Sequence, residues 1–202
     1  MASDLRSKLV EALARDGRPS SDYDLNPDFS LPEGRKLRQA GVLVPIVEIG
    51  GGARLILTMR APSLKHHPGQ IAFPGGKVDE TDKGIVEAAL REAEEEIGLP
   101  PVDVDALGCL PAHETVTGFV ATPVLGLIAP EFQPRVQDGE VAEVFSVPLD
   151  HVLEPANYTI QSRYWRGTRR HYFTVPWGPY YIWGATARML RALADRMAEN
   201  AN

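Results

Sequence analysis

The chain has 202 residues, enough for one domain with a core, and its 44% hydrophobic and 24% charged fractions are ordinary for a globular protein. Its net charge of −6 argues against general binding to nucleic acids or to anionic membranes. No apolar run is long enough to cross a bilayer and the start lacks a signal-peptide core, which together predict a cytoplasmic protein.

The single cysteine, Cys109, excludes an internal disulfide and fits a reducing compartment. Its neighbours are Leu107, Gly108 and Leu110, and this apolar setting predicts a small buried side chain. Cys109 is therefore not favoured as a nucleophile.

The N-terminal part, residues 1–36, is predicted to form a helix and a connector that precede the main domain, residues 37–199. Apolar residues at helical spacing predict a helix over residues 4–15. Residues 17–36 are rich in Pro, Asp, Ser and Gly, which indicates a connector that runs over the surface.

The main domain is predicted to hold strands on both sides of a central helix, with a second helix at its end. The three glycines at 50–52 predict a hairpin turn, and Gly98 with the two prolines after it marks the end of the central helix. Strands are expected at 41–48, 54–60, 69–76, 105–111, 118–128, 141–147, 158–165 and 171–175, and helices at 84–97 and 183–199. This order indicates an α/β fold with a mixed sheet covered on both faces.

The central helix combines an apolar stripe with an acidic face. Glu92, Glu95 and Glu96 are three and four positions apart, so they gather on one face beside the stripe. The stripe that is expected to face the core consists of Val86, Ala89, Leu90, Ala93 and Ile97.

Two interpretations account for the acidic face. In one it is a solvated surface, because glutamate is a good helix former. The other is a metal site: Glu92 and Glu96 repel each other, lie at the helix end that disfavours anions, and have no Lys or Arg four positions away. Carboxylates are the ligands that Mg²⁺ or Mn²⁺ prefers, and the Gly75–Gly76 turn allows a backbone carbonyl to approach the ion, so the metal site is favoured.

Residues 76–99 resemble the Nudix box. This motif consists of a glycine, a glutamate further along, and then the run Arg-Glu-U-x-Glu-Glu-x-Gly-U, where U is an aliphatic residue. The matching residues are Arg91, Glu92, Glu95, Glu96, Gly98 and Leu99, while Ala93 is a small version of the aliphatic position. The spacing from Gly76 to Arg91 is one residue longer than in the box. The expected glutamate then falls on Asp82 or Lys83, and Asp82 is the candidate because it is the only acid of the two.

Residues 56–76 resemble the accessory motif of the coenzyme A pyrophosphatase subfamily. Arg60, Gly69 and the Phe73-Pro-Gly-Gly76 segment match, whereas Lys65 stands where the subfamily has arginine and Ile56 where it has leucine. Further similarity in 114–118, 140–149 and 182–187 extends the resemblance over roughly residues 40–190.

The resemblance implies a Nudix α/β/α sandwich that cuts coenzyme A or a derivative into 3′-phosphoadenosine 5′-phosphate and 4′-phosphopantetheine. It implies that Glu92, Glu95, Glu96 and the carbonyl of Gly75 bind Mg²⁺ or Mn²⁺, and that Arg91 orients the glutamates. Hydrolysis of ADP-ribose or dinucleotides, and a noncatalytic nucleotide- or coenzyme A-sensing module, remain alternatives. The expected partner is a small-molecule substrate, and a homodimer is suggested by analogy.

The substrate-binding candidates precede or form the glycine turn. Arg60 and Lys65 are expected to bind the diphosphate or the 3′-phosphate of coenzyme A, with Gly69 and Phe73 beside them, unless this loop is merely solvated. Hydrolysis also needs a group that activates water. Glu140 is the first candidate for this general base, ahead of Glu143 and Glu114.

A second basic cluster surrounds the predicted hairpin near residue 166. It consists of Arg163, Arg166, Arg169, Arg170 and His171, interleaved with Tyr164 and Trp165. Such a cluster binds phosphate, stacks on adenine or contacts a partner subunit, or it is a hairpin made soluble by arginines. The sequence leaves these roles open.

Overall fold

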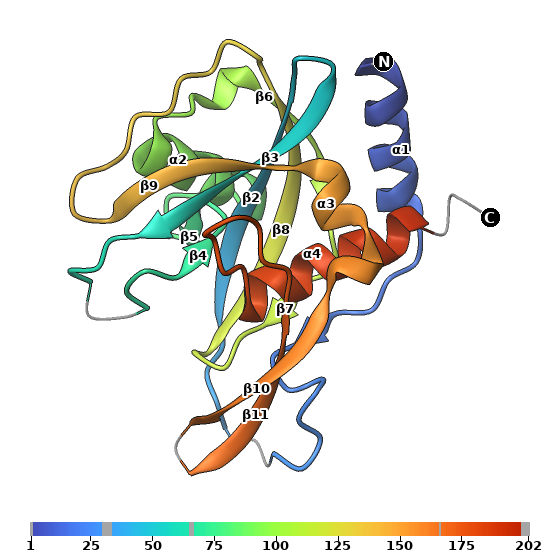
Figure 1. The fold of residues 1–202 in the computed structure, drawn as a ribbon. Helices are drawn as coiled ribbons and strands as arrows, with labels where there is room; N and C mark the ends of the chain where they lie inside the picture. Colours follow the sequence, from blue (N-terminus) through green and yellow to red (C-terminus); the bar gives the residue numbers. More distant parts are fainter. Residues whose placement is uncertain (1, 30–33, 65–66, 166, 199–202) are drawn as a thin grey trace.

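The computed structural model describes residues 2–29, 34–64, 67–165 and 167–198 (Figure 1). The fold is a nine-stranded mixed sheet with helices on both faces, plus a separate two-stranded hairpin, which confirms the predicted α/β class. Across these ranges no helix is both long and apolar enough to span a membrane.

The helices are α1 Ala2–Ala14, α2 Ile85–Ile97, α3 Leu149–Leu153 and α4 Gly184–Ala198, with short 3₁₀ turns at Pro101–Asp103 and Pro155–Asn157. The strands are β1 Ser20–Ser21, β2 Arg38–Ile49, β3 Gly52–Arg60, β4 Ile71–Ala72, β5 Gly75–Lys77, β6 Val104–Cys109, β7 His113–Glu114, β8 Phe119–Ile128, β9 Val141–Pro148, β10 Thr159–Trp165 and β11 Thr168–Thr174. The main path through the sheet is β1-β7-β8-β2-β3-β4, while β5 pairs with β2, β6 with β8 and β9 with β3.

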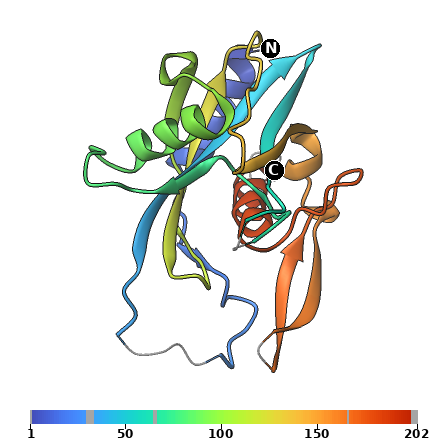
Figure 2. The ribbon, with the colours of Figure 1, turned by 90° about the vertical axis from the view of Figure 1, so that its left-hand side faces the viewer.

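Side chains of the central strands point to opposite faces of the sheet and pack into two hydrophobic cores, one on each face. On β2, Leu43 and Val47 pack with α2, whereas Val44 and Ile46 join the core formed with α1, α3 and α4. Figure 2 shows α2 and α4 on opposite sides of the sheet. This is the α/β/α sandwich that the sequence predicts.

Helix α2 approaches the sheet closely because residue 41 has no side chain. A Cβ atom on Gly41 would lie 2.3 Å from the carbonyl oxygen of Ile85 and 3.0 Å from the amide nitrogen of Ala89. Gly41 also pairs with Gly76 on β5, so the same position fixes the helix and the glycine turn against β2. At its other end α2 stops at Gly98, whose φ of 68° is the left-handed conformation expected of a C-terminal glycine.

The N-terminal helix and connector pack against the rest of the chain. Leu9 of α1 is fully buried in the same core as α4, and Arg196 of α4 donates to the carbonyl oxygens of Ala12 and Arg15 at 2.6 and 2.9 Å. In the connector, Ser20 hydroxyl lies 2.9 Å from Nδ1 of the buried His113, fastening β1 to β7. These contacts attach residues 2–29 to the sheet and to α4.

Three details differ from the sequence-based expectations. The strand expected at 69–76 is two short strands, because β4 pairs with β3 and β5 with β2. Val86 is 37% exposed, and the buried face of α2 instead holds Ala88, Ala89, Ala93, Glu96 and Ile97. Cys109 is exposed, because β6 is an edge strand whose register shifts between Ala106 and Gly108 and so changes which side chains face inward.

Substitution of Gly41 by alanine should lower the free energy of unfolding by about 2–3 kcal/mol, because its Cβ overlaps the α2 backbone and helix or strand must shift. Gly52→Ala is the matched control, since no atom lies within 4 Å of a Cβ there, and its effect should stay below about 1 kcal/mol. Urea unfolding measures both. Equal losses in the two variants would contradict the close approach of α2 to β2.

Candidate active site

Glu96 is a buried carboxylate held by the glycine turn. Only 6% of the residue is exposed, and the Gly75 amide donates to its Oε2 at 3.2 Å. One turn earlier on α2, Glu92 lies so close that a Cβ on Gly76 would sit 2.5 Å from its Cδ. Gly76 therefore makes room for the Glu92 carboxylate, while the Gly75 amide binds that of Glu96.

Burial opposes the charge on both of these groups. It raises the pKa of Glu96 to about 7, with the negative charge of Glu92 acting in the same direction and the Gly75 amide opposing the shift. Burial also raises the pKa of Glu92, although the neighbouring Arg91 opposes this shift. A cation beside the two carboxylates would stabilise their ionised forms.

Arg91 organises the outer side of this acidic group. Its guanidinium contacts Glu92 Oε1 and Glu95 Oε2, each at 3.1 Å from Nη1. It also donates from Nε and Nη2 to both oxygens of Asp82, at 3.0 and 3.1 Å. These bonds, chiefly the pair to Asp82, raise the pKa of Arg91 further above its ordinary value. Arg91 thus fixes the positions of Glu92 and Glu95.

Asp82 holds the Arg91 guanidinium in place through these two hydrogen bonds. Its side chain is 3% exposed and also accepts the Asp79 amide at 2.8 Å. The Arg91 guanidinium and then the Asp79 amide lower the pKa of this carboxyl, so it stays ionised as the partner of Arg91. In the lengthened box Asp82 occupies the predicted acidic position and binds the box arginine.

Glu95 is the most exposed of the three glutamates. Its carboxylate contacts the same Arg91 nitrogen as that of Glu92, and its side chain is 53% exposed against 18% for Glu92. The Glu96 carboxylate instead accepts the Gly75 amide. Within the described ranges, no three Asp, Glu, His or Cys side chains converge on one metal position. The donors nevertheless fit Mg²⁺ or Mn²⁺ in chemistry, because Glu92 and Glu96 supply paired, poorly solvated carboxylate oxygens of the kind these ions prefer.

Arg60 and Glu140 bring further charges to the same place. The Arg60 cation lowers the pKa of Glu96 and the Glu140 carboxylate raises it, so both lie within electrostatic reach of the buried acid. The Ala61 amide donates to the Glu140 carbonyl oxygen at 2.8 Å, which brings the two segments together. Arg60 Nε is buried and finds no hydrogen-bond partner among the described residues, as expected of a group that awaits a ligand.

The segment 131–140 reaches the site because it docks on the end of α2. The amides of Arg135 and Gln137 donate to the carbonyl oxygens of Ile97 and Glu96, at 2.9 and 3.0 Å. Carbonyls at a helix C-terminus lack partners within the helix, so this loop satisfies them and carries Glu140 towards β3. The sequence indicates an irregular loop here but gives no signal for this docking.

The remaining predicted residues occupy several positions. Gly69 donates its amide to the Arg60 carbonyl oxygen at 3.1 Å, and Phe73 is buried in the core beneath the turn. Lys65 lies outside the described residues. Of the alternative bases, Glu143 accepts the Tyr180 hydroxyl at 2.5 Å and Glu114 is paired with Arg35, so both are already engaged.

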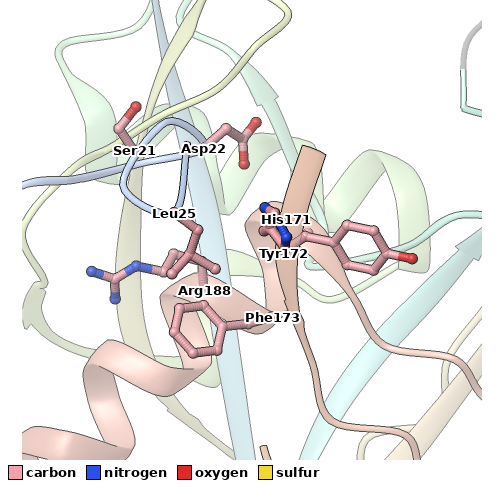
Figure 3. A pocket seen from close by; sticks show the side chains of 8 residues that line it. Ser21, Asp22, Leu25, His171, Tyr172, Phe173 and Arg188 are labelled. Atoms are coloured by element: carbon pink, nitrogen blue, oxygen red, sulfur yellow. The ribbon is translucent and has the colours of Figure 1, made fainter. Parts of the chain in front are cut away.

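A pocket between the connector, β11 and α4 contains none of the carboxylates of α2 (Figure 3). Two of its charged residues have partners elsewhere, because Asp22 accepts the Val116 amide at 2.8 Å and Arg188 is paired with Asp24 at 2.9 Å. The carboxylates beside Gly75 and Gly76 are therefore the candidate site.

Comparison with known proteins identifies the class. The model of the NUDIX domain matches residues 37–166. A relative in Cronobacter sakazakii, called uncharacterized Nudix hydrolase NudL, is 44% identical over 162 residues, covering 80% of this chain and 84% of that protein. A Salmonella paratyphi B relative of the same name is 45% identical over 157 residues, covering 78% of this chain and 81% of that protein.

Solved structures share the fold. A MutT/nudix family protein from Enterococcus faecalis aligns with a TM-score of 0.56 at 16% identity, covering 86% of this chain and 66% of that one. A C. elegans Ap4A hydrolase aligns with a TM-score of 0.53 at 14% identity, covering 82% of this chain and 98% of that one. The chain belongs to the Nudix hydrolase family, whose members act on phosphoanhydride bonds and generally use divalent metals such as Mg²⁺ or Mn²⁺.

The raised pKa of Glu96 predicts how stability depends on pH without metal. The folded protein keeps this proton up to about pH 7, whereas an unfolded glutamate loses it near its ordinary value of 4.5. Stability should therefore fall as the pH rises from about 4.5 to 7, by up to about 3 kcal/mol from this group. Urea unfolding in EDTA measures the loss.

The control for this prediction is Glu96→Gln, which cannot ionise and should lack that part of the loss. Glu94→Gln, on the exposed side of the same helix, should keep the wild-type dependence. A Glu96→Gln profile identical to wild type would show that Glu96 is not the group responsible.

Proposed function

We propose that this Nudix hydrolase cuts the diphosphate of coenzyme A or its derivatives, releasing 3′-phosphoadenosine 5′-phosphate and 4′-phosphopantetheine. The observation that carries the proposal is the buried Glu96 with the half-buried Glu92 beside the glycine turn, with the Arg60 cation within reach. The choice of coenzyme A rests on the resemblance of residues 56–76 to the accessory motif. The single cysteine supports a reducing compartment, so the proposal includes a cytoplasmic location.

The proposal assigns Mg²⁺ or Mn²⁺ to Glu92, Glu96, the Gly75 carbonyl and Glu95, once Glu95 leaves Arg91. A divalent ion held there would neutralise phosphoryl oxygens and acidify a bound water. Arg91 remains tied to Asp82 when Glu95 is released, so it continues to orient Glu92. Separation of the Glu95 carboxylate from Arg91 is the one rearrangement that the proposed ligand set requires.

The other site residues have distinct proposed roles. Arg60 and Lys65 bind the diphosphate oxygens, which places one phosphorus near the carboxylates of α2. Glu140 accepts a proton from the attacking water as the new phosphorus–oxygen bond forms. The bond from that phosphorus to the bridging oxygen then breaks, and the leaving phosphate keeps the bridging oxygen.

The substrate assignment is tested by comparing kcat/KM for coenzyme A, an acyl derivative, ADP-ribose and NADH with Mg²⁺ or Mn²⁺. Coenzyme A or its acyl form should have the highest value, and mass spectrometry should show the two named products. Hydrolysis in ¹⁸O-water then identifies which phosphorus is attacked. Preference for ADP-ribose or NADH would favour the alternative hydrolase, and turnover of none of them would favour the sensing module.

Glu96→Gln should lower kcat by at least about 10²-fold, because it removes a buried carboxylate from the proposed metal site. Loss of a residue that only hydrogen-bonds a metal ligand already costs about 10–100-fold, and loss of a ligand should cost more. Glu94→Gln is the matched control on the same helix and should leave kcat unchanged. Steady-state kinetics at saturating Mg²⁺ measures both. Wild-type kcat in Glu96→Gln would contradict a role for the buried carboxylate.

Glu140→Gln should lower kcat by about 10²–10³-fold with little change in KM, because the amide cannot accept the proton of the attacking water. Glu131→Gln, an exposed acid at the start of the same loop, should behave as wild type. The pH dependence of kcat distinguishes this role from a structural one, since loss of the base removes the acidic limb of the profile. An unaltered profile in Glu140→Gln would assign the base elsewhere.

A further inference from the structure

The β10–β11 hairpin carries a cationic side chain that the proposed chemistry does not use. The hairpin extends away from the main sheet beside the connector (Figures 1 and 2). Its register places Arg163 opposite Arg170 and Gln161 opposite Tyr172, so these four side chains share one face. Tyr164, Arg169 and His171 belong to the other face. Arg166 and the side chain of Trp165 lie outside the described residues.

Arg163 is stacked on an aromatic group. Its guanidinium carbon lies 4.2 Å from the ring centroid of Trp183, and Tyr172 meets the same indole edge-on with ring centroids 5.1 Å apart. Tyr181 belongs to this group, since burial and then the Tyr172 hydroxyl raise its pKa while the Arg163 cation opposes the shift. We call Arg163, Tyr172, Tyr181 and Trp183 the hairpin patch.

The charge of Arg163 lacks a carboxylate partner within the described ranges. Arg163 is exposed, and in the part of the chain that the structure describes no Asp or Glu forms an ion pair with it. Its register partner across the hairpin, Arg170, is buried and lies over the rings of Phe29 and Tyr23, 4.4 and 5.3 Å from their centroids. An anion bound at Arg163 would neutralise the exposed charge of this side chain.

The stacking prepares Arg163 for such an anion. A guanidinium plane that lies on an indole keeps its N–H edge available, and that edge matches two oxygens of a phosphate. Beside it, the exposed Tyr181 is a flat surface on which a purine base can stack. The patch therefore combines donors for a phosphomonoester with a stacking surface for a base.

A short structural connection joins the patch to the catalytic turn. Thr186, three residues after Trp183 in the first turn of α4, donates its hydroxyl to the Ile71 carbonyl oxygen at 3.0 Å. Ile71 lies four residues before Gly75. Three residues from Trp183 to Thr186, the hydrogen bond and four residues from Ile71 to Gly75 place Trp183 within roughly 33 Å of the glycine turn as an upper limit.

We infer that the hairpin patch binds the phosphomonoester on the nucleoside half of the substrate, which in coenzyme A is the 3′-phosphate. The inference rests on the proposed function for the identity of the substrate. It makes Arg163 a specificity-determining residue and assigns Trp183 the role of holding the guanidinium in place. Trp183 lies in the 182–187 segment that the sequence resemblance includes, so the inference assigns this segment a role in substrate binding.

The binding test uses adenosine 3′,5′-bisphosphate, adenosine 5′-monophosphate and inorganic phosphate, titrated calorimetrically into the full chain in EDTA. The bisphosphate should bind at least about tenfold more tightly than the other two, and Arg163→Ala should remove this difference. Arg169→Ala, on the opposite face of the hairpin, should keep it. Arg163→Lys should recover it only in part, because lysine retains the charge but not the planar stack.

The kinetic test compares coenzyme A with 3′-dephospho-coenzyme A. Arg163→Ala should raise KM for coenzyme A by about tenfold, leave kcat nearly unchanged, and leave both constants unchanged for the dephosphorylated substrate. Circular dichroism and a wild-type rate on 3′-dephospho-coenzyme A confirm that the variant is folded.

Two results would overturn the inference. One is equal affinity of the wild type for the bisphosphate and for inorganic phosphate, and the other is an unchanged preference for coenzyme A in Arg163→Ala. Failure of the proposed function can be told apart from failure of this inference. If the proposed function is wrong, the wild type hydrolyses neither form of coenzyme A. The binding test still decides whether Arg163 recognises the 3′-phosphate.

Discussion

The burial of the Glu96 carboxylate against the Gly75 amide is the interaction on which the rest of the site depends. It requires α2 to lie close to β2 and β5, where side chains on Gly41 and Gly76 would meet the helix, and a side chain on Gly75 would separate β5 from β2. The same approach brings Glu92 against Gly76, so two acids share a poorly solvated space. An arrangement that costs free energy in the absence of a cation is common at functional sites, where it prepares the protein for its ligand.

The basic residues around this acidic pair have separate tasks. Arg91 is bound to Asp82 through both carboxylate oxygens, which makes it a fixed support for Glu92 and Glu95. Arg60, at the end of β3, has a buried Nε without a hydrogen-bond partner among the described residues, and we propose that its guanidinium binds the substrate. The division between a structural arginine and a ligand-facing one explains how a protein with a net charge of −6 presents positive groups to a polyanion.

Much of the fold and part of the site could be predicted, because their signals are local. The period of α2, the glycine that ends it and the spacing of Glu92 and Glu96 are all encoded within a few residues. The docking of the 131–140 loop on α2 depends on backbone bonds between distant segments, so the pattern could not reveal it. The exposure of Val86, Cys109 and Glu95 depends on which neighbours compete for each side chain. Position on a helix indicated that the three glutamates are near one another, but not that Arg91 contacts two of them while Glu96 is buried against Gly75.

We propose that a buried, partly protonated Glu96 becomes a ligand of a divalent ion. Titration of Mg²⁺ or Mn²⁺ into the protein at pH 7, in buffers of different ionisation enthalpy, measures the protons released on binding. Because the pKa of Glu96 is about 7, we expect release of about half a proton per ion in the wild type and none from this group in Glu96→Gln. Binding that releases no proton, or that is equally tight in Glu96→Gln, would contradict the account.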